Sequence, residues 1–243
     1  MKLQEGILII LSAVILAFSV SFPNFSIFYY SLISFAIILI TTTIAKKLAE
    51  KLGLDYLDTG ATYRTLTLKA LRDGVSVNDE KALSELALKL NINFDGTRVL
   101  LDGEDVTDAI RMPEINNNIS PVVAHPGVRE AMVNLQREIA QKGDYVVEGR
   151  DITTVVFPNA EHKFYMDAKF EIRFKRRWME VEAKGMDITK EELIASMRKR
   201  DIADTTREVG ALKMADDAYY FDTSDFNIDQ VIEKLSQFIK CHG

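Results

Sequence analysis

The alternation of short apolar runs with longer amphipathic segments constrains the fold of this chain more than any other feature. Leu54–Leu57, Tyr145–Val147 and His162–Met166 have the length of buried strands, and the segments Ala61–Arg72 and Pro126–Gln141 between them have helical periodicity. Strands that alternate with helices pair in parallel and are covered by helices on both faces. We therefore predict an α/β fold built on a mostly parallel sheet.

A different pattern interrupts this alternation between the first two strands. Asp95-Gly96 and Asp102-Gly103 bracket the apolar run Val99–Leu101. Asp-Gly is a frequent turn of β-hairpins, because both positions tolerate a positive φ angle. We therefore predict a small antiparallel β unit inserted into the main fold.

Size, charge and cysteine content exclude several classes of protein. With 243 residues and 47% hydrophobic content, the chain can bury the core of one large domain or two small ones. A net charge of −6 disfavours a general nucleic-acid-binding protein, because nucleic acids select basic surfaces. The single cysteine, Cys241, cannot form an internal disulfide. His125, His162 and His242 share no metal-ligand spacing, so no protein metal site is predicted.

The first part of the chain is apolar. Pro23-Asn24 divides the uncharged stretch 6–45 into two runs, each near the shortest length that spans a membrane as a helix. A helical hairpin would place Lys2 and Lys46 on one side and leave the main domain in the cytosol. The alternatives are a non-native leader and a signal peptide, although the length of the stretch fits a signal peptide poorly.

Two polar stretches follow predicted strands. Thr59–Arg64 follows the first strand and Glu148–Asp151 follows the second. Because the carboxyl ends of parallel strands meet at one edge of a sheet, both stretches lie where α/β proteins bind ligands. Asp58 or Thr59 can cap the new helix. Arg64 lies one turn inside that helix, where its guanidinium can bind two oxygens of a phosphate. The alternatives are a capped helix with a surface arginine and a surface ion pair after the second strand.

Basic residues gather on two adjacent helices that follow the third strand. Thr189 and Glu192 form a capping box at the start of the second of these helices. The basic residues are Arg173, Arg176 and Arg177 on the first helix and Arg200 and Arg207 on the second, where they flank Asp204 at i, i+4 and i+7. Such a run is usually a solvated face or a row of salt bridges. The functional alternative is a hinged lid that holds phosphates.

Ordered sequence motifs are spread from Thr43 to the end of the chain. They are Ile44–Ala49, Tyr56–Arg64, Gly103–Val106, Val128–Glu130, Gly149–Asp151, Val155–Pro158 and Arg200–Arg207. In this set and order they resemble the bacterial-type cytidylate kinases. The resemblance implies a P-loop NTPase-like nucleoside monophosphate kinase core, with a monophosphate-binding insert and a lid. Such an enzyme transfers the terminal phosphoryl group of ATP to CMP or dCMP, with Mg²⁺ as cofactor.

The resemblance implies a role for each residue that matches a family motif. The residues that would face the cytosine are Thr59, Arg129 and Asp151. Those that would hold the sugar are Ser120, Arg200 and Asp204, and those that would grip the monophosphate are Arg64, Arg150 and Arg207. The lid over ATP would carry Arg173, Arg176 and Arg177, and the catalytic charges would be Arg150, Arg176 and Arg207. Arginines suit this chemistry, because phosphoryl transfer depends on positioning and on neutralising the transferred oxygens.

The resemblance also implies how the chain is divided. It predicts a kinase domain over 44–243, with the insert at 75–120 and the lid at 168–207. Residues 1–43 are then a separate apolar segment, either a membrane hairpin or an aberrant start. Mild mismatches occur inside the domain, where Glu148, Thr153 and Thr62 stand in place of the family's usual aspartate, glycine and methionine.

The main departure concerns the glycine-rich phosphate loop, Gly-x-x-x-x-Gly-Lys-Ser/Thr, that the family carries before residue 44. Ungapped alignment places Phe35 and Ile40 at its glycines, Thr41 at its lysine and Thr42 at its serine. No glycine occurs from 7 to 52. The amides, lysine and hydroxyl of such a loop bind phosphates and Mg²⁺. We therefore expect weak ATP binding and slow turnover, with Thr42 still able to touch the metal.

Two functional hypotheses follow. The first is a cytidylate kinase, expected to be a cytoplasmic monomer that acts on small nucleotides and not on nucleic acid. The second is a non-catalytic cytidine-nucleotide-binding protein, tethered to a membrane through residues 6–42 with its domain in the cytosol. If the family's first strand is missing, Tyr29–Ile33 or Ala36–Ile40 is expected to replace it, because a gap in the middle of a sheet leaves backbone groups unpaired.

Overall fold

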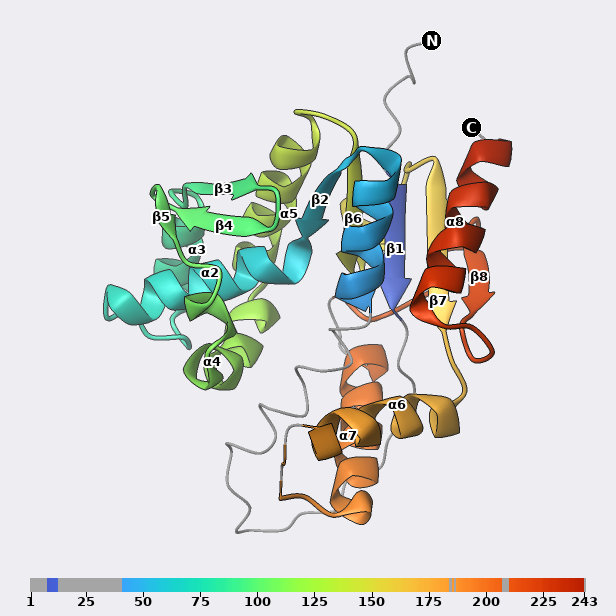
Figure 1. The fold of residues 1–243 in the computed structure, drawn as a ribbon. Helices are drawn as coiled ribbons and strands as arrows, with labels where there is room; N and C mark the ends of the chain where they lie inside the picture. The colour runs from blue at the N-terminus through green and yellow to red at the C-terminus, as the bar shows by residue number, and fades with distance from the viewer. Residues whose placement is uncertain (1–7, 13–40, 184, 186, 207–209, 243) are drawn as a thin grey trace.

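A parallel five-stranded sheet forms the centre of the molecule (Figure 1). The computed structural model describes residues 8–12, 41–183, 185, 187–206 and 210–242. The strands are β1 (Leu8–Ser12), β2 (Asp55–Asp58), β6 (Tyr145–Gly149), β7 (His162–Asp167) and β8 (Tyr219–Asp222). They lie in the order β2-β6-β1-β7-β8, and each neighbouring pair is parallel. This confirms the predicted α/β fold.

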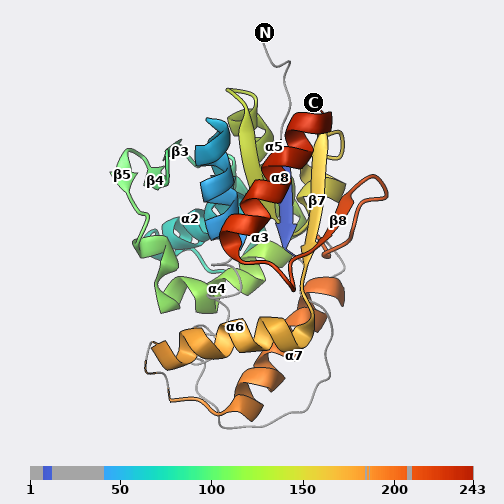
Figure 2. The same ribbon diagram turned by 45° about the vertical axis from the view of Figure 1, so that its right-hand side comes forward.

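Helices cover both faces of this sheet, and strand β6 shows how the faces are divided. Val146 packs in one cluster with Ile44, from the helix over residues 41–52, and Val231 of α8 (Ile228–His242). Val147 packs in another cluster with Val133 of α5 (Pro126–Ala140). Successive strand residues point to opposite faces, so each face has its own apolar layer. The helix over 41–52 and α8 lie side by side on the same face in Figures 1 and 2.

The predicted antiparallel insert is present between β2 and β6. After α2 (Thr59–Arg72) and α3 (Glu80–Ala87), the chain forms a three-stranded sheet in the order β3-β4-β5. These strands are Ile92–Asp95, Arg98–Leu101 and Glu104–Asp105. Gly96, Asp102 and Gly103 have positive φ angles at the turns, as the Asp-Gly pattern requires. A short 3₁₀ turn (Ala109–Arg111) and α4 (Pro113–Ala124) then lead to α5.

Two helices form a separate layer beyond the ends of the central strands. They are α6 (Phe170–Ala183) and α7 (Lys190–Thr206), which share the buried cluster Val181, Leu193 and Met197. The predicted capping box is present, since the Thr189 amide donates to Glu192 Oε2 at 2.9 Å and the Glu192 amide donates to Thr189 Oγ1 at 3.2 Å. In Figure 1 the arrowheads of β1 and β7 point towards this pair of helices.

The N-terminal part of the chain differs from the sequence expectation. Residues 8–12, part of the first apolar run of the expected membrane hairpin, form β1 in the middle of the sheet. Leu8 is in register with Val146 of β6 on one side and with His162 of β7 on the other. A segment bonded on both sides within a sheet cannot also be a membrane helix, so that expectation is wrong for these residues. The sequence analysis expected residues 29–33 or 36–40 to replace the family's first strand. Residues 8–12 occupy that place, and both of the expected ranges lie outside the described residues. No helix in the described part of the chain is long and apolar enough to cross a membrane.

Candidate active site

The turn from β2 into α2 holds a buried ion pair. Asp58 caps the helix, since its Oδ1 accepts the Ala61 amide at 2.9 Å, and its Oδ2 accepts from Arg64 Nη2 at 2.5 Å. Both side chains are about one tenth exposed or less. Between the two predicted caps, Asp58 and Thr59, the structure selects Asp58. Arg64 is thereby fixed at the carboxyl edge of the sheet, where a phosphate could meet the first turn of a helix.

Strand β6 lies unusually close to the start of α2. Thr59 Oγ1 donates to the carbonyl oxygen of Glu148 at 2.8 Å. A Cβ atom at Gly149 would overlap Thr59 Oγ1 and lie 2.7 Å from Ile152 Cγ2. Only glycine permits this approach, so Gly149 serves to bring the two predicted polar stretches together.

A buried carboxyl lies beneath these residues. Glu148 is 6% exposed and accepts from Thr42 Oγ1 at 2.6 Å and from the hydroxyl of Tyr56. Burial, and next the nearby carboxylate of Asp58, raises the pKa of Glu148 to about 8. The sequence analysis missed Tyr56. The available signal was the parallel pairing of β2 with β6, which sets Asp58 beside Glu148 and Tyr56 one pleat away on the same face.

The Arg129–Asp151 pair joins α5 to the end of β6. Arg129 Nη2 bonds Asp151 Oδ2, and the two side chains are 9% and 14% exposed. The guanidinium also lies 5.9 Å from the ring centroid of Tyr63 in α2, within the range of a cation–π contact. Burial raises the pKa of Tyr63 to about 12, so this ring keeps its hydroxyl proton. Tyr63 is a second residue that the sequence analysis did not select.

Asp204 connects α7 to the same edge of the sheet. Its Oδ2 lies 2.7 Å from Arg150 Nε and 3.6 Å from Arg200 Nε, and its side chain is 2% exposed. Arg150 follows β6 and Arg200 lies one turn earlier on α7. The structure therefore brings together three residues that were predicted to hold the sugar and the phosphate.

The three predicted lid arginines all lie on α6, and each bonds to another residue of the protein. Arg173 pairs with Asp201 of α7 at 3.1 Å. Arg176 donates to the carbonyl oxygens of Thr223 at 2.7 Å and Phe226 at 3.1 Å, in the turn after β8. Arg177 donates to Glu180 at 2.8 Å. Burial lowers the pKa of both Arg176 and Arg177.

Ser120 and Arg207 are the two remaining predicted residues. Ser120 is exposed on α4 of the insert. Arg207 lies outside the described residues. Their assigned roles stay predictions.

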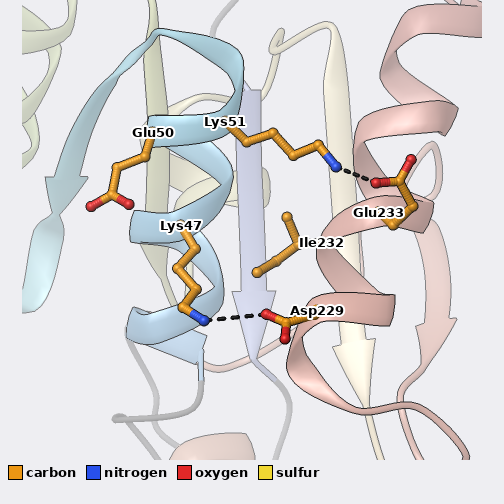
Figure 3. Close-up of a pocket in the computed structure, with 6 residues that line it drawn as sticks. All are labelled: Lys47, Glu50, Lys51, Asp229, Ile232 and Glu233. Carbon is orange, nitrogen blue, oxygen red and sulfur yellow. Dashed lines mark hydrogen bonds and ion pairs between the residues drawn. The ribbon is translucent and has the colours of Figure 1, made fainter.

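A surface hollow of about 530 Å³ lies elsewhere, between the helix over 41–52 and α8. Figure 3 shows two ion pairs that bridge it, Lys47 to Asp229 at 3.2 Å and Lys51 to Glu233. Exposed ion pairs between two packed helices are ordinary contacts along a helix–helix seam. The carboxyl edge of the sheet is therefore the better candidate for an active site.

One family model and several known proteins with the same name match this chain. The family model described as cytidylate kinase matches residues 41–241. A cytidylate kinase from Caldanaerobacter subterraneus is 44% identical over 82% of this chain and 89% of its own length. A cytidylate kinase from Syntrophotalea carbinolica is 46% identical over 82% and 86%, and one from Clostridium botulinum is 41% identical over 82% and 92%.

Proposed function

We propose that this chain, which belongs to the cytidylate kinase family, transfers the terminal phosphoryl group of ATP to CMP or dCMP and so forms CDP or dCDP. The single observation that carries the proposal is the largely buried Arg129–Asp151 pair at the end of β6. Such a pair at the carboxyl edge of a parallel sheet offers one donor group and one acceptor group to a planar ligand.

Cytosine matches this pair chemically. Its exocyclic amino group is a donor that the Asp151 carboxylate can accept, and its ring nitrogen and carbonyl are acceptors for the Arg129 guanidinium. Uracil has a carbonyl in place of the amino group, so it would face the carboxylate with an acceptor. Thr59, held on the Glu148 carbonyl at 2.8 Å, lies on the same edge and completes the proposed base site.

The monophosphate and the sugar would be held next to the base. Arg64, in α2 and paired with Asp58 at the end of β2, and Arg150, after the end of β6, provide fixed positive charge for the phosphate. Asp204 and Arg200 come from α7 and could bond the sugar hydroxyls. Ser120 and Arg207 are proposed for the sugar and the phosphate on the family resemblance alone.

Mg²⁺ is the proposed cofactor and would arrive with ATP. Among the described residues no group of three or more histidine, cysteine, aspartate or glutamate side chains is arranged to hold a metal. The Thr42 hydroxyl, 2.6 Å from the Glu148 carboxyl, is a hard oxygen donor of the kind Mg²⁺ accepts, and Glu148 would join it by releasing the proton that its raised pKa favours. These two groups fit an ion that is held chiefly by nucleotide phosphates. The ion would neutralise charge on the transferred group.

The chemical step would depend on position and charge. Arg150 and Arg207 would neutralise the acceptor phosphate, and Arg176 of α6 would exchange its bonds to the turn after β8 for the oxygens of ATP. Arg173 and Arg177 would support the same lid. Phosphoryl transfer requires little covalent participation of the protein, so aligned arginines carry much of the rate.

Binding of CMP by the full chain tests the base site directly. We expect calorimetry to show CMP binding, and Arg129→Ala to weaken it about 30-fold or more, since losing one member of a buried charge pair costs about 2–5 kcal/mol. Arg98→Ala is the matched control, because Arg98 forms an exposed pair with Asp95. A coupled assay with ATP, Mg²⁺ and CMP reports turnover in the same samples. Equal CMP affinity in both variants would contradict the proposed base site.

The second hypothesis, a membrane-tethered binding protein without catalysis, gains no support. The family match and the three relatives all concern kinases. Residues 8–12, from the segment expected to tether the domain, lie in its central sheet.

A further inference from the structure

The segment that leaves α7 touches the base site through a glycine. Gly210 has a φ angle of +71°, a conformation that favours glycine. A Cβ atom at this position would lie 2.5 Å from Arg129 Cζ, 2.7 Å from Arg129 Nη1 and closer still to Nη2. The backbone of Gly210 therefore rests directly against the guanidinium that is proposed to bind the base.

Arg129 has little room to move away from this contact. Its guanidinium is bonded to Asp151 on one side and faces the ring of Tyr63 on another, and the residue is 7% exposed. A shift that relieved an overlap with a Cβ atom would break or bend the Arg129–Asp151 bond. Such charge-assisted bonds depend strongly on geometry.

Gly210 is also held from its own side. Two residues later, Leu212 is 4% exposed and packs in the apolar cluster that contains Val133 and Val147. The Leu212 amide donates to the carbonyl oxygen of Asp204 at 2.7 Å. Asp204 in turn pairs with Arg150, so the segment after α7 is tied to the end of β6.

We propose that Gly210 is a positioning residue for the acceptor base: its bare backbone encloses the Arg129 guanidinium and holds it on Asp151. The end of lid helix α7 and the base site then form one connected unit. This inference rests on the proposed function, in which Arg129 and Asp151 bind cytosine. Gly210 itself does not need to touch the nucleotide.

Two glycine substitutions separate this role from backbone strain. Gly185, in the turn after α6, has a φ angle of +60°, and a Cβ atom there would meet nothing within 4 Å. Gly210→Ala and Gly185→Ala therefore introduce similar strain, but only the first overlaps Arg129. We expect Gly210→Ala to weaken CMP binding about tenfold or more, as for a disturbed charge-assisted bond. Gly185→Ala should leave the dissociation constant within about twofold.

The readouts distinguish positioning from a general loss of structure. Calorimetry with CMP and UMP on the full chain should show that Gly210→Ala lowers the preference for CMP, because only CMP presents the amino group to Asp151. A variant that weakened both nucleotides equally would overturn the inference. In an Arg129→Lys background, which lacks the planar guanidinium, adding Gly210→Ala should change CMP affinity by no more than about twofold. A full additional loss in that background would also overturn it.

A measurement on the unaltered protein does not depend on the variants folding. Saturating CMP should slow amide hydrogen exchange at 210–212 and leave the Gly185 turn unchanged. Unchanged exchange at 210–212 in a protein that binds CMP would overturn the role of Gly210 alone. Failure of the unaltered chain to bind CMP would overturn the proposed function itself.

Discussion

The proposed acceptor side and the proposed lid use arginines in different ways. On the acceptor side, Arg64 and Arg129 pair with carboxylates at the carboxyl ends of strands β2 and β6, at the edge where the substrate is proposed to sit. On the lid, Arg173 pairs with a carboxylate of the neighbouring lid helix. Arg176 bonds backbone carbonyls in the turn after β8. The arginines of the first set lie at the edge of the sheet, whereas those of the second set bond to α7 and to the turn after β8.

This difference indicates which substrate site is preorganised. Charges held by paired strands need little rearrangement to meet a nucleotide, so acceptor binding should depend mainly on residues already in place. In the proposed mechanism the arginines of α6 exchange protein partners for phosphate oxygens, so donor binding should involve movement of α6 and α7. Changes on the donor side should therefore alter turnover more than CMP affinity.

Restoring the glycine-rich loop tests the comparison most strongly. The combined variant Phe35→Gly, Ile40→Gly and Thr41→Lys supplies the family's loop at the aligned positions. We expect turnover to rise about 10²–10³-fold, the usual worth of a preorganised donor to the transferred group. The calorimetric CMP dissociation constant should stay within about twofold, because these donors do not contact the acceptor.

The single variant Thr41→Lys is the control, because it adds charge without the glycines. Melting curves should accompany it, since Thr41 is buried in the unaltered chain. If the unaltered chain already turns over at about 1–100 s⁻¹, the range of ordinary kinases, another segment holds the ATP phosphates. The expected deficit on the donor side would then be wrong.

The pH dependence of stability should come partly from the lid. Burial raises the pKa of Asp201 to about 7, although its bonds to Arg173 act in the opposite direction. Between about pH 4, its ordinary value, and pH 7, the folded chain keeps a proton on Asp201 that the unfolded chain releases. The Asp201 contribution to the free energy of unfolding therefore falls as pH rises through this window. We expect the wild-type chain to lose about 2–4 kcal/mol there relative to Asp201→Asn.

Urea unfolding at a series of pH values measures this difference. Asp95→Asn is the control, because it removes an exposed carboxylate of the insert. Its pH profile should follow that of the wild-type chain. If the free energy of unfolding varied with pH in the same way for wild type and Asp201→Asn, the surroundings of Asp201 would not disfavour its charged form.

The smallest effect is expected at the seam between the helix over 41–52 and α8. Lys51→Ala removes the exposed ion pair with Glu233, and such pairs contribute about 0–1 kcal/mol. Its unfolding free energy should fall by no more than that, with CMP affinity and turnover unchanged. A loss of activity would make the hollow of Figure 3 a functional site and add a third region to the comparison.

Local patterns predicted much of the fold. The apolar runs and helical periodicities located β2, β6 and β7, and the Asp-Gly turns located the small sheet. The Thr189–Glu192 capping box formed as predicted. The meeting of Thr59 with Glu148 also followed from sequence, because the carboxyl ends of parallel strands share an edge.

Long-range features were the ones missed. A continuous apolar run has no internal period that separates a buried strand from a membrane helix, so the length of 6–22 suggested a span where the structure has β1. Tyr56 on Glu148 and Gly210 on Arg129 depend on contacts between distant segments. The Tyr56 contact could have been sought from strand pairing. No local signal marked the Gly210 contact.

The position of β1 also has a consequence for the order in which the chain folds. A ribosome makes this strand first, but both of its neighbours, β6 and β7, begin only at Tyr145 and His162. Until then the hydrogen-bonding groups of Leu8–Ser12 have no native partner, and the sheet cannot close around them. Such distant pairing slows folding and exposes apolar intermediates to aggregation. A nascent chain released before β6 would carry its central strand unpaired, as a natural target for chaperones.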